Sequence, residues 1–298
     1  MNRREFVALA AAAPFALRSL DLAPRAFVTC DSQSRLAVVD LGSFRVVGSI
    51  RTLPDPRAIE LVGRRAVVCH TAVGGLSLID PGHAVKVVRG LVEPRYTAAH
   101  PDGRHAFVTD SGRSSVVAVD LDAGKIVGRV RLSGWARHIT IDAAGKRLWV
   151  GLGSASDTVA VVGVAPFAHV TTIVPGFNAH DVGHAPDGRL WITSGDAGTV
   201  SIAGRRLSAD AAPQHVAFGA GRAFVTSGDA GTLHTQMLDG TIIRTAPVPN
   251  GSYNVQFGHG RVITPSLDRG TLAVLNAKGA LLDVVQVADS CHDACFAP

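Results

Sequence analysis

A repeat of about 40 residues runs through this chain and constrains its fold more than any other feature of the sequence. Asp40, Asp80 and Asp120 each close a short apolar run. A strand of the Ala-Phe-Val-Thr type precedes these runs and recurs in seven copies, which begin at Ala26, Ala66, Ala106, Leu148, Leu190, Ala223 and Val262. Two copies share the stretch Thr-Ser-Gly-Asp-Ala-Gly-Thr, which indicates duplication. A period of this length is typical of repeat architectures.

Each copy contains four short runs of β-branched or alternating residues, separated by turns rich in Gly, Asp and Ser. In the third copy these runs cover residues 105–109, 115–120, 125–132 and 137–142. Such runs indicate antiparallel strands joined by tight turns, and they argue against helices. Four strands in each of seven copies predict an all-β fold, a seven-bladed β-propeller with four-stranded antiparallel blades.

The phase of the repeat predicts how the ring closes. The first copy opens on the second strand of a blade, so its inner strand must come from residues 291–296. The C-terminal strand is therefore expected to join the N-terminal blade. The repeats use nearly all of the chain, which favours one domain over residues 24–298. We expect this domain to be a monomer.

Residues 1–23 do not follow the repeat. Arg3 and Arg4 precede Phe6 and an alanine-rich apolar run to Leu17, which is too short to span a bilayer. The pattern predicts a twin-arginine-type export signal, with a frayed N-terminal helix as the alternative. We therefore expect an exported protein, periplasmic or extracellular, with no transmembrane segment in the mature chain.

The charge balance argues against nucleic acid as a partner. The net charge is +5, which is mild for 298 residues, and basic residues form no cluster along a predicted element. No platform of aromatic residues for base stacking is present either. The sequence therefore points to a small-molecule or anionic ligand, or to a protein partner.

The four cysteines leave the disulfide state open. Cys291 and Cys295 lie in one predicted strand, too far apart to pair with each other. An antiparallel terminal strand would place Cys30 diagonally next to Cys291, so a bridge across the closing blade is one alternative. Free buried thiols are the other.

The copies share a more specific pattern: Phe107-Val108-Thr109, then Ser111-Gly112, then Val119-Asp120, with Pro94-Arg95-Tyr96 at the start of the inner strand. This pattern resembles the YVTN-type propeller repeat over residues 25–298. It departs where Gly163 and Asn276 replace the closing Asp and where Pro265 enters a strand. The resemblance implies a scaffold shared by carbohydrate- and redox-associated periplasmic propellers, lactonases and lyases. It implies no single chemistry.

The starts of the seven inner strands are expected to surround one mouth of the channel. Their first ring reads Arg57, Arg95, Arg137, His180, Gln214, Tyr253 and His292, and the next reads Ala58, Tyr96, His138, Asp181, His215, Asn254 and Asp293. Arginine suits a carboxylate or phosphate. We therefore assign ligand binding to Arg57, Arg95, Arg137, Tyr96, Gln214, Tyr253 and Asn254. The alternative for the three arginines is that they are solvated or paired with aspartates on a wet channel wall. We assign a divalent metal to His138, His180, Asp181, His215, His292 and Asp293, residue types that also serve acid–base catalysis.

Three other motifs receive a structural interpretation. The pair Cys69-His70 is read as a packed thiol beside a surface histidine, with metal ligation as the alternative. The Gly-Asp-Ala-Gly stretches at 195–198 and 228–231 are read as hairpin turns. The turns at His100-Pro-Asp-Gly103 and His184-Ala-Pro-Asp-Gly188 are expected on the face opposite the mouth.

Two hypotheses about function follow. The first is an exported binding or interaction module that takes a small or anionic ligand at the channel mouth. The alternative is an enzyme, a metal-assisted lyase or lactone hydrolase that uses the histidines and aspartates of the same rings.

Overall fold

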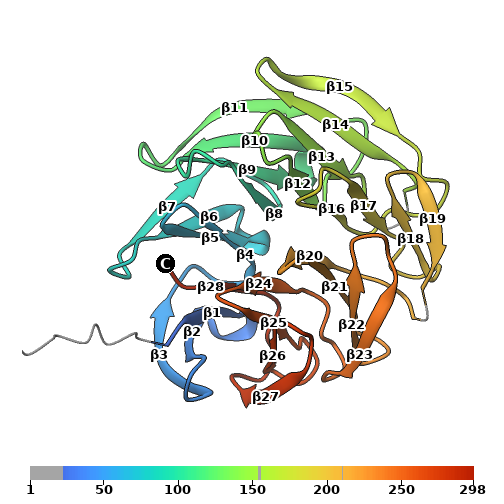
Figure 1. Cartoon of the computed structure of the whole chain (residues 1–298). Coiled ribbons are helices and arrows are strands. Elements are labelled where there is room, and N and C mark those ends of the chain that lie inside the picture. The colour runs from blue at the N-terminus through green and yellow to red at the C-terminus, as the bar shows by residue number, and fades with distance from the viewer. Residues whose placement is uncertain (1–22, 154–155, 210) are drawn as a thin grey trace, which may run out of the picture.

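The computed structural model describes residues 23–153, 156–209 and 211–298. The predicted export signal therefore lies outside the described residues, except for Ala23. Seven four-stranded antiparallel sheets surround one axis, which confirms the predicted seven-bladed β-propeller (Figure 1). In the described part of the chain, no helix is long and apolar enough to cross a membrane.

The strands of each blade follow one another outward from the centre. Blade 1 contains β28 (Ala294–Phe296), β1 (Arg25–Cys30), β2 (Arg35–Asp40) and β3 (Arg45–Arg51). Blade 2 contains β4 (Pro56–Val62), β5 (Arg65–His70), β6 (Gly75–Ile79) and β7 (Val85–Arg89). Blade 3 contains β8 (Pro94–Ala99), β9 (His105–Asp110), β10 (Ser115–Asp120) and β11 (Lys125–Arg131). Blade 4 contains β12 (Ile139–Ile141), β13 (Arg147–Gly151), β14 (Val159–Val164) and β15 (Phe167–Ile173).

The remaining blades repeat this order. Blade 5 contains β16 (Val182–His184), β17 (Leu190–Thr193), β18 (Thr199–Ile202) and β19 (Arg205–Ser208). Blade 6 contains β20 (Val216–Gly219), β21 (Arg222–Ser227), β22 (Thr232–Met237) and β23 (Ile242–Pro247). Blade 7 contains β24 (Gln256–Gly258), β25 (Arg261–Pro265), β26 (Thr271–Asn276) and β27 (Leu281–Gln286). Three 3₁₀ turns join second to third strands: η1 (Asp31–Gln33), η2 (Thr71–Val73) and η3 (Ser111–Arg113).

The middle strands of the blades form the core. All six residues of β10 are buried, whereas most residues of the outer strand β3 are exposed. Middle strands are covered on both faces by neighbouring blades, which explains their nearly continuous apolar sequences. Between blades 3 and 4, for example, Phe107 packs against Phe167 with ring centroids 5.5 Å apart.

The ring closes as the repeat phase predicts. β28 pairs with β1 in antiparallel register, with Val28 opposite Ala294. The strand covers residues 294–296 and is shorter than the predicted 291–296. The difference has a local cause: the Thr29 hydroxyl takes the peptide N–H of Asp293 at 2.8 Å and interrupts the ladder there. β12 is likewise shorter than the predicted 137–142.

All four cysteines are buried free thiols. Cys291 and Cys295 do not pair with each other, as expected. The Cys30 thiol donates to the Val28 carbonyl at 3.7 Å and lies close to that of Cys291, and the interaction of the two thiols lowers the pKa of Cys30 and raises that of Cys291. The predicted neighbours therefore meet, but as thiols rather than as a bridge.

Deletion of residues 291–298 tests the closure. The deletion removes β28 and exposes the apolar faces of blades 1 and 7, so we expect an insoluble protein or one with a much lower unfolding midpoint. Thermal unfolding of the truncated and intact chains measures this. A truncated chain that unfolds like the intact one would contradict a closed ring.

Mild oxidation of the purified protein tests the thiol contact. Because the thiols of Cys30 and Cys291 lie close enough to shift each other's pKa, we expect oxidation to join this pair before any other, and a Cys30→Ser variant to form no bridge. Peptide mapping under non-reducing conditions identifies the linked peptides. Four thiols that remain open to alkylation, or a different pair, would refute the prediction.

Candidate functional site

The ring residues are held at the channel mouth by a hydroxyl latch, a threonine that is the last or the penultimate residue of the second strand in several blades. Thr193 Oγ1 accepts the Asp181 N–H at 3.1 Å and donates to the Gln214 carbonyl of the next blade at 2.5 Å. Thr109 likewise accepts the Tyr96 N–H at 3.0 Å and donates to the Arg137 carbonyl at 2.7 Å. Each latch therefore fixes two neighbouring ring positions at once.

Three of the predicted histidines converge. His138, His180 and His215 come from blades 4, 5 and 6, and one nitrogen of each lies within 4.8 Å of the others. The rings of His138 and His215 are 4.6 Å apart, and those of His138 and His180 are 4.9 Å apart. Tyr96 packs on the other side of His138, at 4.2 Å between centroids. Three of the six residues that the sequence assigns to a metal therefore lie close to one another.

Burial keeps these histidines neutral. His138 is only 1% exposed, and burial together with the nearby charges of His215 and His180 lowers its pKa well below its usual range. Burial and then Arg137 lower the pKa of His180 to about 4. Neither ring nitrogen of His138 makes a hydrogen bond of normal geometry with the described residues. The three rings are therefore neutral at neutral pH, and each has one nitrogen with a lone pair and one that carries a hydrogen.

The three arginines differ from one another. Arg57 lies 3.7 Å from Asp55, and Arg95 forms an ion pair with Glu93, so acids two residues earlier neutralise both. Arg137 forms no ion pair within the described residues. Its guanidinium carbon lies 5.7 Å from the centre of the Trp135 ring. Among the described residues, Arg137 is therefore the one arginine of the three whose positive charge is not compensated by an acid, and it lies beside the histidines.

The other predicted ligand-binding residues are engaged in holding the mouth. Tyr253 donates to Asp229 at 2.8 Å, and the Gln214 amide donates to the same carboxylate at 3.2 Å. The Asn254 amide donates to the His292 carbonyl at 2.7 Å. Of the predicted ligand-binding residues, this leaves Arg137 and Tyr96. The Tyr96 ring packs directly against the histidines.

The remaining predicted metal ligands lie outside the group of three histidine nitrogens, although Asp181 Oδ2 lies 3.6 Å from His215 Nδ1. Asp181 accepts the Val216 N–H at 3.0 Å, and Asp293 accepts the Ile59 N–H at 3.0 Å, so each carboxyl joins two blades. Burial raises the pKa of Asp181 to about 7 and that of Asp293 to about 8. His292 lies apart, and burial lowers its pKa to about 3.

A cavity of about 240 Å³ continues from the mouth into the channel, lined by the inner strands. Glu60 lies deeper and accepts a hydrogen bond from Gln256 across the channel at 3.0 Å. Burial raises the pKa of Glu60 to about 7. The volume lies below the usual range for drug-sized ligands, about 300–1,000 Å³, so it suits a small molecule.

Two motifs have contacts that the sequence reasoning missed. The Gly195 and Gly228 stretches form the predicted hairpin turns, but a side chain at Gly195 would lie 2.7 Å from His180 Nδ1. A side chain at Gly228 would lie 2.4 Å from the Tyr253 ring. The signal in the sequence was that both glycines lie in the identical Thr-Ser-Gly-Asp-Ala-Gly-Thr stretches of two copies. The reading of His70 as a surface residue was wrong, because it is fully buried and bonds to Pro54 and Ser77.

No family model matches the sequence, and a search of curated proteins finds no match. Solved structures share the fold. Hydrazine Synthase from Kuenenia stuttgartiensis is 18% identical with a TM-score of 0.74, over 84% of this chain and 91% of that one. A functionally unknown protein from Desulfotomaculum acetoxidans is 13% identical with a TM-score of 0.77, over 91% and 98%. A streptogramin B lyase is 12% identical with a TM-score of 0.66, over 78% and 83%. These identities show a common propeller fold.

The buried carboxyls predict how stability depends on pH. The folded pKa values of Glu60, Asp181 and Asp293 exceed those of the unfolded chain, so the stability that these carboxyls contribute falls as pH rises above about 4 and is fully lost once pH passes about 7 to 8. The buried histidines act oppositely, because their folded pKa values are lowered and stability rises with pH until the unfolded histidines have lost their protons, at about pH 7. Between pH 6.5 and 8.5 we therefore expect the chelator-treated protein to lose about 1–2 kcal/mol of unfolding free energy.

Denaturant unfolding across this pH range checks the prediction. Asp293→Asn keeps an oxygen for the Ile59 N–H and cannot ionise, so its stability should fall less steeply with pH. Equal slopes for the variant and the unaltered protein would rule out Asp293 as a source of the effect.

Proposed function

We propose that the channel mouth binds a divalent transition metal through His138, His180 and His215. The observation that carries this proposal is the convergence of three neutral histidines from three separate blades. Neutral imidazole is the form that binds metal, and it suits zinc, copper, iron and nickel. Three histidines with an open fourth position form a known ligand set of catalytic zinc sites.

We further propose that the metal and Arg137 together hold a small anionic ligand. Arg137 contributes to the lowered pKa of both His180 and His215, which places its positive charge close to the cluster. A metal ion and this guanidinium repel each other, and an anion between them would relieve the repulsion. Metal and anion should therefore each raise the affinity for the other. The small cavity favours a carboxylate or phosphate on a compact molecule.

A second candidate function, an enzyme, is favoured by Asp181. Its Oδ2 lies 3.6 Å from His215 Nδ1, and its pKa of about 7 suits a group that both takes and gives a proton near neutral pH. A bound metal would polarise a substrate carbonyl. This arrangement supports a metal-assisted lyase or lactone hydrolase. The proposal retains a monomeric, exported protein.

Alanine variants of the two halves of the site test this function. His180→Ala and His215→Ala should each remove one equivalent of bound Zn²⁺, as measured by metal analysis after dialysis. Arg137→Ala should keep the metal and weaken binding of phosphate or malonate by about 1.5–3 kcal/mol, the range for hydrogen bonds to charged groups. Arg95→Ala should do less, because Glu93 already neutralises Arg95. Calorimetric titration measures both affinities.

His169→Ala is the matched control, because His169 is an exposed histidine on the outer strand β15. It should change neither metal nor anion binding. Asp181→Asn separates the enzyme from the binding module: it should abolish any turnover and leave the metal in place. Full Zn²⁺ binding by both histidine variants would show that the cluster does not bind metal.

A further inference from the structure

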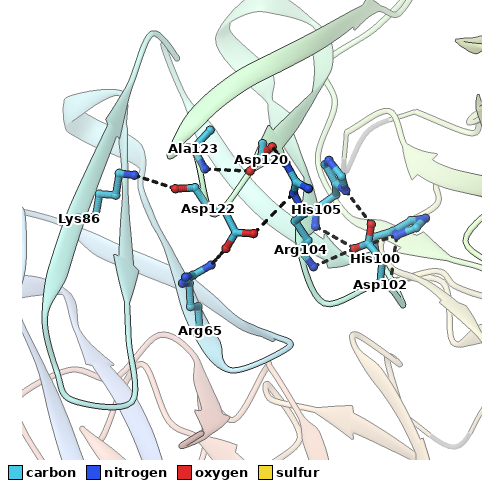
Figure 2. A network of polar contacts seen from close by, with 9 residues as sticks. All are labelled: Arg65, Lys86, His100, Asp102, Arg104, His105, Asp120, Asp122 and Ala123. Atoms are coloured by element: carbon cyan, nitrogen blue, oxygen red, sulfur yellow. Dashed lines mark hydrogen bonds and ion pairs between the residues drawn. The ribbon is translucent and has the colours of Figure 1, made fainter.

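A second cluster of metal-ligating side chains lies at the opposite end of β8 (Figure 2). His100 follows the last residue of β8, His105 opens β9, and Asp102 lies in the turn between them. Four residues separate His100 from Tyr96 at the mouth, which corresponds to about 13 Å along a strand. The cluster is therefore separate from the mouth histidines.

The distances within the cluster suit one metal ion. His105 Nδ1 lies 2.7 Å from one carboxylate oxygen of Asp102, and His100 Nδ1 lies 3.0 Å from the other. Two ligand atoms that each lie about 2.0–2.1 Å from a tetrahedral zinc ion are about 3.4 Å apart. The three side chains are thus within a few tenths of an ångström of the spacing of adjacent ligands, and small outward movements would bring them around a metal.

The orientation of His100 points to a cation. Its Nε2 lies 3.2 Å from the Gly145 carbonyl, which can only accept, so Nε2 carries the hydrogen and Nδ1 presents a lone pair. That lone pair faces a carboxylate oxygen of Asp102, and among the described residues the one hydrogen-bond donor to it is the Asp102 N–H, at 3.3 Å. A carbonyl that fixes the tautomer in this way is the usual support of a metal-binding histidine.

Gly145 provides the space for this arrangement. It lies in the next blade with φ of +68°, and a side chain there would approach His100 Nε2 to 2.5 Å. The next blade therefore both orients the His100 ring and leaves room for it.

The negative charge of Asp102 interacts with the two imidazoles and with backbone N–H groups. The neighbouring Arg104 side chain turns away to Asp120, at 2.7 Å, and to Asp122 (Figure 2). The equivalent turn of blade 5 is a contrast within the same chain. There Leu190 stands at the position of His105, and Arg189, which corresponds to Arg104, donates from Nε to Asp187 at 2.8 Å.

We propose that His100, Asp102 and His105 bind a divalent transition metal ion on the face opposite the channel mouth. Two imidazole nitrogens and one carboxylate oxygen favour zinc, nickel or copper over calcium and magnesium, which prefer oxygen ligands. Because the ligands must be deprotonated, binding should weaken as the pH falls.

Calorimetric titration of the chelator-stripped full chain with Zn²⁺ at pH 7.5 tests the proposal. In a His180→Ala/His215→Ala background, which removes the mouth cluster, one equivalent should still bind. Adding His105→Asn keeps a side-chain N–H for Asp102 and should weaken this binding at least tenfold. His169→Asn is the matched control and should have no effect. Gly145→Ala should also weaken binding, because it displaces His100.

The outcomes separate this site from the mouth site. If the double-histidine background does not fold, as judged by thermal unfolding, His105→Asn in the unaltered chain should remove one of two equivalents. No Zn²⁺ binding in the folded background would overturn the proposal, since the cluster would then hold only protons. Zn²⁺ binding that is unaffected by His105→Asn, or matched by Ca²⁺, would overturn it too. Loss of the mouth site alone leaves this result unchanged.

Discussion

The threonine hydroxyl at the end of the second strand is the interaction on which the channel mouth depends. A hydroxyl both accepts and donates, so one side chain can join a peptide N–H of its own blade to a carbonyl of the next. Thr109, Thr193 and Thr226 all do this, and all are fully buried. Without the hydroxyl, two buried backbone groups would lose their partner. The latch thus links the repeat pattern of the sequence to the geometry of the site.

The same latches create the electrostatics of the mouth. They hold residues from separate blades together in a buried site. Burial keeps His138 and His215 neutral there, and it keeps part of the Asp181 population protonated near pH 7. Against this background the charge of Arg137 lacks an acidic partner within the described residues. A site with neutral ligands and one cation that has no ion-pair partner among the described residues favours a metal together with an anionic ligand.

The fold could be predicted from the sequence because each blade buries its strands locally, so period and alternation suffice. The ion pairs that Arg57 and Arg95 form with acids could also be predicted, since each arginine has an acid two residues before it. Trp135 stands in that place before Arg137. Which histidines converge could not be predicted, because this depends on the angle between blades. The opposite cluster was overlooked because its Pro and Gly residues already accounted for a hairpin turn.

The central claim is that His138, His180 and His215 share one metal ion. Crystals grown with Zn²⁺ and measured on both sides of the zinc absorption edge test it most directly. The account predicts an anomalous difference peak at about 2.0–2.1 Å from one nitrogen of each histidine. Crystals that hold zinc elsewhere on the molecule but show no peak among these three rings would contradict it.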